Sequence, residues 1–381
     1  MKPSAPEFVL PLMPQNARVN RCSVPRESAS RRILIMRLGA HGDILMGTPL
    51  LTALRAAWPD AHLTWIVERK ERDSIDAHPF IDELLLWDGA YWKRMLRRGL
   101  FPLWLARGLR FRRELWERRY DVFISFQPEE WPLLTRAVSA PMSVGVFDTF
   151  RQFSQATGRS PHTRLYSTAF TEPYLPPHRT DQYLLPLRAL GLPEPADKRM
   201  SLGYTAEDAE AAVQILGATE QFAVLAPMTT WPSRCWPAER YAALGDALAR
   251  THGCRIVLIG SAKERPAIEA IAAQMKTPPL VAAGTLRFRE MAALISRASL
   301  LVSGDTGPMH VAAALGIPYI ALFGPTPVEG RAPLAGRGLS LLHPVPCGPC
   351  DQKICRHADE NERLCLRRIS VDEVLAAARS L

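Results

Sequence analysis

The chain has 381 residues, 47% of them hydrophobic, and a formal net charge of +9 at pH 7. This length predicts two globular domains, and no apolar run reaches the roughly 20 residues of a membrane-spanning helix, so we expect no span. Residues 93–119 contain ten lysines and arginines but only two glutamates, so this basic segment carries a net +8 and the remainder is nearly neutral. Charge confined to one segment argues against a nucleic-acid-binding protein, which distributes it along a groove.

Residues 1–30 are expected to form a flexible leader. They include several prolines and a short apolar patch, FVLPLM, that Pro11 interrupts. A secretory signal would need a longer apolar stretch followed by a small-residue cleavage site. We therefore expect a cytoplasmic protein.

The elements expected after the leader alternate between strands and helices. Residues 31–38 (RRILIMRL) predict a strand, and the turn GAHGD at 39–43 leads into a helix that ends before Pro59. Further strands are expected at 62–68, 82–88, 120–126 and 142–147. Continuous apolar strands that alternate with helices predict a parallel sheet buried on both faces.

The basic segment, residues 93–119, lies between the third and fourth of these strands. Its apolar residues at helical spacing are Trp104, Gly108, Phe111 and Leu115, with Leu105, Leu109 and Trp116 beside them. Gly99 and Pro102 predict a division into two short helices. The apolar stripe fits a surface helix that packs on the core, and with its flanking arginines it also fits a helix that rests on an anionic membrane. Nucleic-acid binding is the third interpretation.

A second series of elements begins near residue 220. Strands are expected at 222–227, 254–260, 299–304 and 318–324, and helices at 238–253, 264–275, 289–298 and 309–316. Residues 178–199 contain a helix that ends at Gly191 and then a linker with prolines. The sequence therefore predicts an α/β protein with two parallel-sheet, Rossmann-like domains, residues 31–190 and 200–345, that face each other across a cleft. A cysteine-rich segment and a closing helix follow at 346–381.

The turn SGDTGPMH at residues 303–310 has the features of a phosphate-binding site. It follows a buried strand and opens a helix, so its backbone N–H groups and the positive end of the helix dipole point outward. Thr306 and His310 can donate hydrogen bonds, and Gly307 allows a ligand to approach closely. The alternative is an ordinary turn in which Asp305 or Thr306 only caps the helix.

The corresponding turn of the first half, GAHGD at 39–43, fits neither of two common phosphate-binding motifs. It lacks the lysine of a Walker A loop and the spacing of a dinucleotide-binding G-x-G-x-x-G. A carboxylate would also repel a phosphate cradled there. We therefore expect Asp43 to act as a base towards a hydroxyl or as a helix cap.

Three stretches together resemble glycosyltransferase family 9, the bacterial heptosyltransferases of lipopolysaccharide core assembly. They are RLGAHGDILMGTPLLTALRAAWP, SRCWPAERYAAL and SGDTGPMHVAAALGIPYIALFGPT. The resemblance implies a GT-B fold in which the second domain holds most of the sugar nucleotide. It also implies inverting, metal-independent transfer of a heptose from ADP-heptose to a hydroxyl of a lipid-anchored lipopolysaccharide core acceptor.

The resemblance implies roles for individual residues. Asp43 matches the family's catalytic carboxylate, and Glu264 matches its ribose-binding acid. The family's D-T-G-x-x-H turn, which holds the donor diphosphate, matches Asp305, Thr306, Gly307 and His310.

One position departs from the family pattern. The family commonly has lysine in a K-x-W-P stretch, whereas this chain has Arg234 followed by Cys-Trp-Pro. Arginine keeps the charge and can hold a phosphate through two hydrogen bonds. We therefore expect Arg234 to stabilise the leaving diphosphate without a metal. The basic segment 93–119 would lie on the acceptor side, which favours docking at the inner face of the inner membrane.

Four of the seven cysteines, Cys347, Cys350, Cys355 and Cys365, lie within 19 residues. A C-x-x-C pair followed by two further cysteines is typical of a Zn or Fe thiolate site, and disulfides are disfavoured in the cytoplasm. We expect one structural Zn or Fe ion here. The alternative is a cysteine-rich tail that binds nothing.

Two other functions stay open at this point. A sugar-nucleotide epimerase of the same fold would need neither a lipid acceptor nor the basic segment. A non-catalytic basic module that binds a membrane or nucleic acid would leave GAHGD and SGDTGPMH unexplained.

Overall fold

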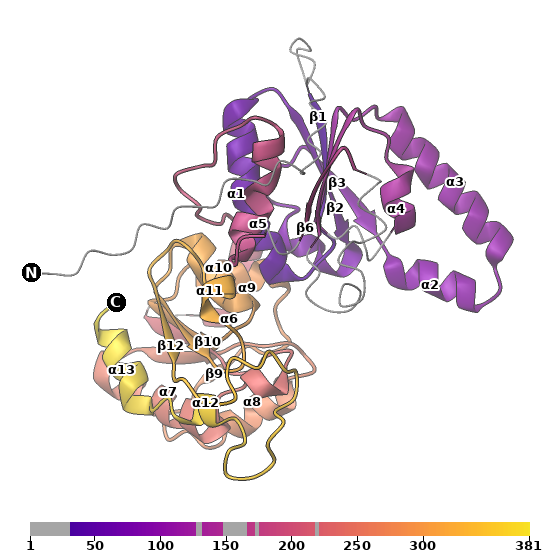
Figure 1. Cartoon of the computed structure of the whole chain (residues 1–381). Helices are drawn as coiled ribbons and strands as arrows, with labels where there is room; N and C mark the ends of the chain where they lie inside the picture. Colours follow the sequence, from indigo (N-terminus) through magenta and orange to yellow (C-terminus); the bar gives the residue numbers. More distant parts are fainter. Residues whose placement is uncertain (1–30, 127–131, 148–165, 172–174, 218–220) are drawn as a thin grey trace, which may run out of the picture.

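The computed structural model describes residues 31–126, 132–147, 166–171, 175–217 and 221–381, and it contains two six-stranded sheets (Figure 1). The strand order is β3-β2-β1-β4-β5-β6 in the first sheet and β12-β11-β10-β7-β8-β9 in the second. All strand pairs are parallel. The order reverses between β1 and β4 and between β7 and β10, and ligands of such sheets bind at these switch points. The predicted α/β fold with two Rossmann-like sheets is confirmed. The expected leader, residues 1–30, lies outside the described residues.

The first sheet comprises β1 Arg32–Met36, β2 His62–Glu68, β3 Glu83–Trp87, β4 Val122–Ser125, β5 Met142–Phe147 and β6 Thr168–Thr171. Its helices are α1 His41–Ala57, the 3-10 helix η1 Arg69–Ser74, α2 Gly89–Arg97, α3 Phe101–Glu117, α4 Pro132–Ala137 and α5 Arg179–Ala189. Successive side chains of β1 point to opposite faces. Ile33 and Ile35 pack in a core with α1 and α5, whereas Leu34 and Met36 pack in a second core with α3 and α4.

The second sheet comprises β7 Phe222–Ala226, β8 Arg255–Leu258, β9 Leu280–Val281, β10 Leu300–Gly304, β11 Tyr319–Phe323 and β12 Gly338–Leu342. Its helices are α6 Ala206–Leu216, η3 Pro232–Arg234 (3-10), α7 Ala238–His252, α8 Arg265–Ala272, α9 Phe288–Ile295, α10 Gly307–Leu315, α11 Val328–Arg331, α12 Leu364–Arg367 and α13 Val371–Arg379. Leu301 of β10 packs with α9 and α10, and Val302 packs on the opposite face with α7 and α13. The C-terminal helix α13 therefore covers one face of this sheet (Figure 1).

The sequence did not predict three of the strands, and all three lie at sheet edges. These strands are β6, β9 and β12. An edge strand pairs on one side only and is less buried, so it needs no continuous apolar run. The helix α6 was also missed, and α1 begins at His41, which places Asp43 in its first turn rather than in a loop.

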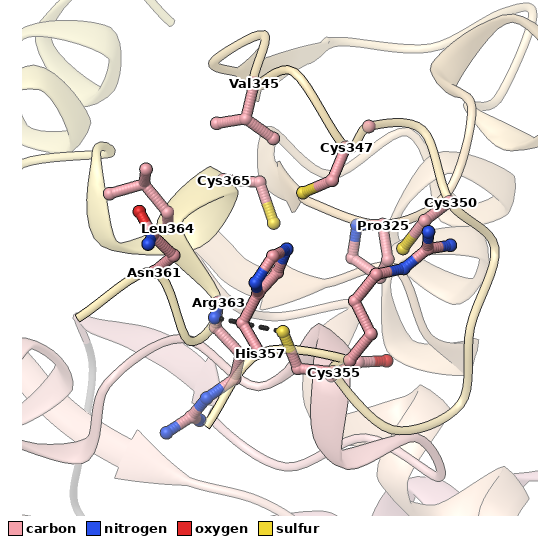
Figure 2. Close-up of a pocket in the computed structure, with 13 residues that line it drawn as sticks. Pro325, Val345, Cys347, Cys350, Cys355, His357, Asn361, Arg363, Leu364 and Cys365 are labelled. Carbon is pink, nitrogen blue, oxygen red and sulfur yellow. Dashed lines mark hydrogen bonds between the residues drawn. The ribbon is translucent and has the colours of Figure 1, made fainter. Parts of the chain in front are cut away.

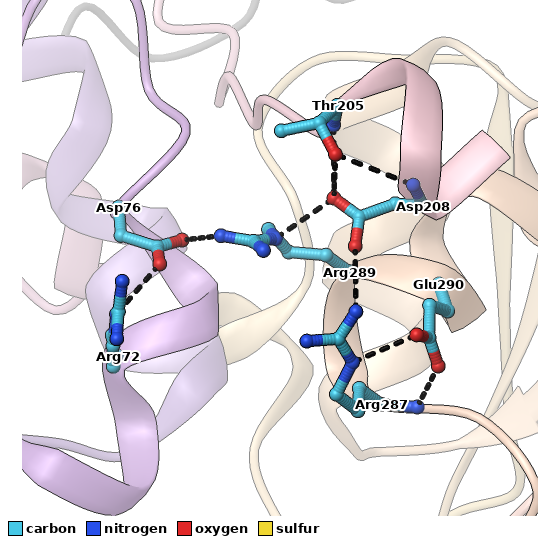
Figure 3. A network of polar contacts seen from close by, with 7 residues as sticks. All are labelled: Arg72, Asp76, Thr205, Asp208, Arg287, Arg289 and Glu290. Carbon is cyan, nitrogen blue, oxygen red and sulfur yellow. Dashed lines mark hydrogen bonds and ion pairs between the residues drawn. The ribbon is translucent and has the colours of Figure 1, made fainter. Parts of the chain in front are cut away.

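A network of charged side chains joins the two halves (Figure 3). Arg289 on α9 pairs with Asp76, which follows η1, and its Nε lies 2.9 Å from Oδ2 of Asp208 on α6. Asp208 also closes a capping box with Thr205 at the start of α6. A second link joins His178 to α11, because its Nδ1 accepts from the Thr180 amide and its Nε2 therefore donates to the Ala332 carbonyl at 2.6 Å. These links fix how the end of η1 and the start of α5 face the second half.

The basic segment forms the predicted pair of helices. Gly99, with φ +69°, separates α2 from α3. The residues Trp104, Gly108, Phe111 and Leu115 form the inward face of α3, and Leu115 is fully buried. Within the described ranges, no helix is both long and apolar enough to cross a membrane.

Candidate active site

Asp43 is the third residue of α1, the helix that follows the carboxyl end of β1. Its Oδ2 is 2.8 Å from Nη2 of Arg37, and its Oδ1 accepts a 3.1 Å hydrogen bond from the hydroxyl of Tyr183 on α5. A quarter of its side chain is exposed. No side chain caps α1 at Ala40. The carboxylate is thus bound through both oxygens and still reaches solvent.

Several guanidinium groups surround this carboxylate. Burial alone would raise the pKa of Asp43, but the nearby charge of Arg37 acts against it. The charges of Arg179 and Arg331 and the hydrogen bond from Tyr183 add to that effect, so the pKa falls to about 2. Asp43 is therefore ionised at neutral pH and can accept a proton.

The turn SGDTGPMH connects β10 to α10 as predicted. Thr306 is the N-cap residue of α10, yet its side chain makes no capping hydrogen bond. It is half-exposed, as is Gly307, where an added Cβ would meet only His41 at 4.0 Å. The N–H groups of the first turn and the hydroxyl of Thr306 therefore face open space, which suits an anion.

His310 lies one turn further along α10 and is buried. Its ring packs against Gly42 of α1, since an added Cβ there would be only 2.7 Å from Cδ2 of His310. Burial lowers the pKa of His310 to about 4, so the ring is neutral. Among the described residues, Nδ1 has no hydrogen-bond partner. The structure thus brings the two predicted turns together across the two sheets.

Arg234, in η3, lies beside the same turn. Its Nη1 is 3.3 Å from Oδ2 of Asp305, and its guanidinium carbon stacks 3.7 Å from the ring centroid of Trp231. The same oxygen of Asp305 accepts a 2.8 Å hydrogen bond from Thr326. Asp305 therefore holds the guanidinium in place, which explains why a carboxylate lies beside a predicted phosphate site. An added Cβ at Gly304 would lie 2.9 Å from the carbonyl oxygen of Arg234, so this glycine makes room for the Arg234 backbone.

Glu264 precedes α8 at the carboxyl end of β8. Its Oε2 accepts hydrogen bonds from the amide of Ser261 at 2.7 Å and from the hydroxyl of Ser261 at 2.8 Å. One of the two carboxylate oxygens of Glu264 thus binds Ser261, three residues earlier in the same loop.

The four cysteines of the C-terminal segment line one cavity of about 20 Å³ together with His357 (Figure 2). All four are free thiols, and Cys355 Sγ accepts a hydrogen bond from the Arg363 amide at 3.3 Å. Burial raises the pKa of the Cys365 thiol. No group of three or more His, Cys, Asp or Glu side chains in the described ranges is placed to hold a metal ion. The expected structural Zn or Fe ion is not supported.

Five residues of this region were not singled out from the sequence. They are Arg37, Arg179, Tyr183, Arg331 and Asp351. Arg37 lies in the quoted stretch RLGAHGD, two positions before its first glycine, and Asp351 directly follows the C-x-x-C pair. The other three come from stretches without a motif, and only the folded chain brings them near Asp43 or Arg234.

Comparison with known proteins supports a single family. The family model described as glycosyltransferase family 9 (heptosyltransferase) matches residues 108–359. The chain is 27% identical over 353 residues to lipopolysaccharide heptosyltransferase 3 of Escherichia coli strain K12. The aligned stretch covers 90% of this chain and 95% of the relative.

Two solved structures have the same fold. The crystal structure of a family 9 glycosyltransferase from Veillonella parvula DSM 2008 has a TM-score of 0.75 at 24% identity and covers 92% of this chain and 96% of its own. The E. coli heptosyltransferase WaaC with ADP-2-deoxy-2-fluoro heptose has a TM-score of 0.66 at 23% identity. The match covers 92% of this chain and 99% of WaaC. The family model spans well over half of the chain, so the protein belongs to glycosyltransferase family 9, the heptosyltransferase family, and is a glycosyltransferase.

Proposed function

We propose that the protein transfers a heptose from ADP-heptose to a hydroxyl of a lipopolysaccharide core acceptor, with inversion and without a catalytic metal. The observation that carries the proposal is the contact between the two turns, in which His310 of α10 packs against Gly42, the neighbour of Asp43. The relatives named above are a lipopolysaccharide heptosyltransferase and a heptosyltransferase with an ADP-heptose analogue.

The second sheet would hold the donor. The diphosphate lies at the N-terminus of α10, where Thr306, the Gly307 amide and His310 donate hydrogen bonds to it. Arg234 neutralises the charge that gathers on the departing diphosphate. Glu264 accepts hydrogen bonds from the ribose hydroxyls at the carboxyl end of β8.

Asp43 would take the proton from the acceptor hydroxyl. The hydroxyl oxygen bonds to the anomeric carbon while the bond from that carbon to the diphosphate breaks, so ADP leaves with the electron pair and the proton moves to Asp43. A carboxylate with a pKa of about 2 accepts this proton only late, once the attacking oxygen has become strongly acidic. One base and no covalent intermediate give inversion at the anomeric carbon.

The basic segment 93–119 would hold the enzyme at the cytoplasmic face of the inner membrane, where its lipid-anchored acceptor resides. Seven of its large apolar side chains are exposed in the structure: Leu96, Leu100, Phe101, Leu103, Leu105, Leu109 and Trp116. Lys93 and exposed arginines flank them on α2 and α3. Apolar side chains flanked by cations are typical of helices that rest on anionic lipid.

A transfer assay with ADP-heptose and progressively truncated lipopolysaccharide acceptors tests the proposal. The wild type should release ADP only with an acceptor that keeps the reacting sugar. Asp43→Asn removes the proton acceptor but keeps the shape, so turnover should fall by roughly 10²–10⁴ while donor affinity stays the same. A wild type that turns over no acceptor, or a fully active Asp43→Asn variant, would contradict the proposed reaction or its base.

A further inference from the structure

Asp351 lies beside the proposed donor site although it belongs to the cysteine-rich segment, directly after Cys350. Its backbone has φ +45°, a left-handed conformation that aspartate tolerates better than most residues. Its amide donates a 2.7 Å hydrogen bond to the carbonyl of Pro325. The carbonyl of the next residue, Gln352, accepts a 2.6 Å hydrogen bond from Ser233.

These two hydrogen bonds fix the Asp351 backbone between two loops of the site. Ser233 precedes Arg234, and Pro325 precedes the threonine that binds Asp305. The cysteine-lined cavity also has Ser233 and Pro325 in its wall. The segment is thus attached to the site at the backbone level.

The side chain of Asp351 lies between two arginines. Its Oδ1 is 3.9 Å from Nη2 of Arg234 and 3.8 Å from Nη2 of Arg331 on α11. The exposed fractions of the three side chains are 18%, 9% and 22%, so water screens these charges only partly.

The two arginines serve different parts of the site. Arg234 also pairs with Asp305 beside the α10 turn, whereas Arg331 is close enough to Asp43 to lower the pKa of that carboxyl. Like charges so close together repel each other unless an anion lies between them. Asp351 supplies this anion to both guanidinium groups through one oxygen.

We propose that Asp351 is a positioning residue for glycosyl transfer, which holds the guanidinium of Arg234 at the diphosphate site and that of Arg331 towards Asp43. The proposal rests on the proposed function, because it needs a diphosphate at Arg234. The proposal predicts that loss of the Asp351 charge lowers turnover but not ADP binding. Without the carboxylate the site stays cationic and still attracts ADP. Arg234 keeps Asp305 and Trp231, but both arginines lose the anion between them and are held less well for the departing charge.

The test compares Asp351→Asn with wild type in transfer kinetics and in calorimetric titration with ADP. Loss of the charge should lower kcat roughly ten- to a hundredfold, as expected for misplaced catalytic groups, while the Kd for ADP stays within about threefold or falls. Glu360→Gln, an exposed acid of the same segment, should behave as wild type. Asp351→Glu should recover part of the lost kcat.

A double variant shows whether the effect passes through the arginine. Asp351→Asn should lower kcat by a smaller factor in the Arg331→Gln variant than in the wild type, because one of the two partners of Asp351 is already gone. Normal kcat in Asp351→Asn would overturn the inference while leaving the proposed function intact. A parallel fall in kcat, ADP affinity and thermal stability would make Asp351 structural and would also overturn it. A wild type that neither binds ADP nor transfers heptose would instead overturn the proposed function.

Discussion

The ring of His310 on α10 packs against Gly42 on α1, and a Cβ at position 42 would lie 2.7 Å from Cδ2 of the histidine. Gly42 therefore permits the close approach of α1 and α10 at the point where the two predicted turns meet. Asp43, the next residue, lies close enough to His310 for its charge to act on the pKa of that ring.

Replacement of Gly42 by alanine should separate the two turns. We expect turnover to fall at least tenfold, because displacement of a catalytic group by about 1 Å can cost up to about a hundredfold in rate. ADP affinity should fall less than turnover, since the added methyl would press on His310 but leave Thr306, the Gly307 amide and Arg234 of the proposed diphosphate site in place. Gly47→Ala on the same helix is the control, because its Cβ would make only an ordinary contact with Trp65 at 3.4 Å. Equal kinetics for the two variants would refute the role of this contact.

The hydroxyl of Thr306 is predicted to bind the donor diphosphate. Because it makes no capping bond in α10, Thr306→Val should not destabilise the helix through a lost cap. Calorimetric titration should instead show ADP binding weakened by about 1–3 kcal/mol, the usual cost of a hydrogen bond to a charged group. Unchanged ADP affinity together with unchanged stability would place the diphosphate elsewhere.

Charge reversal at Arg112 and Arg113 is predicted to release the enzyme from anionic vesicles. Both side chains are exposed on α3, so their attraction to lipid is screened by salt. The KM for lipid acceptor should rise, while ADP binding is unaffected. The double variant Arg250→Glu and Lys276→Glu makes the same charge change on the second half and should bind vesicles as wild type does. Loss of binding in both variants would indicate nonspecific attraction.

Stability is predicted to fall as the pH drops from about 6.5 to 4. Burial lowers the pKa of His78 to about 4, whereas an unfolded histidine titrates near 6.5. Between these values the unfolded state binds more protons, so acidification favours it. Each histidine with a pKa lowered to about 4, His310 included, should reduce the free energy of unfolding by about 2 kcal/mol between pH 7 and pH 5.

Urea unfolding at the two pH values, at constant ionic strength, measures this loss. His78→Gln should make the loss of unfolding free energy between pH 7 and pH 5 smaller by about 2 kcal/mol, because glutamine does not titrate. The exposed His252→Gln variant should leave it unchanged. A His78→Gln protein with the same pH dependence as wild type would show that His78 is not the titrating group.

The sequence predicted the central strands and the two turns because each has a strong local signal. The strands β1, β7 and β10 are continuous apolar runs, and SGDTGPMH combines two glycines with a helix start. The edge strand β12 has only partly buried and exposed positions and includes a glycine and a serine, so it lacks such a run. No local pattern marks Tyr183 or Arg331 either, because each reaches Asp43 only after separate helices have packed together.

The expected metal at the cysteines is not supported, for a different reason. Spacing alone favoured a metal site, but metal binding depends on the mutual geometry of the ligand atoms. The fold brings the four thiols to one cavity, yet within the described ranges no group of three or more possible ligands is placed to hold a metal ion. Sequence spacing does not report this geometry.

The two contacts of Asp43 also bear on the regiochemistry of the new glycosidic bond. Each carboxylate oxygen has two lone pairs, and Arg37 occupies one on Oδ2 while Tyr183 occupies one on Oδ1. The carboxylate therefore cannot rotate to follow a hydroxyl that approaches from another direction. With Asp43 as the proposed base, only the acceptor hydroxyl that meets the remaining lone pairs would lose its proton. Arg37 and Tyr183 would then select which oxygen of the acceptor is glycosylated.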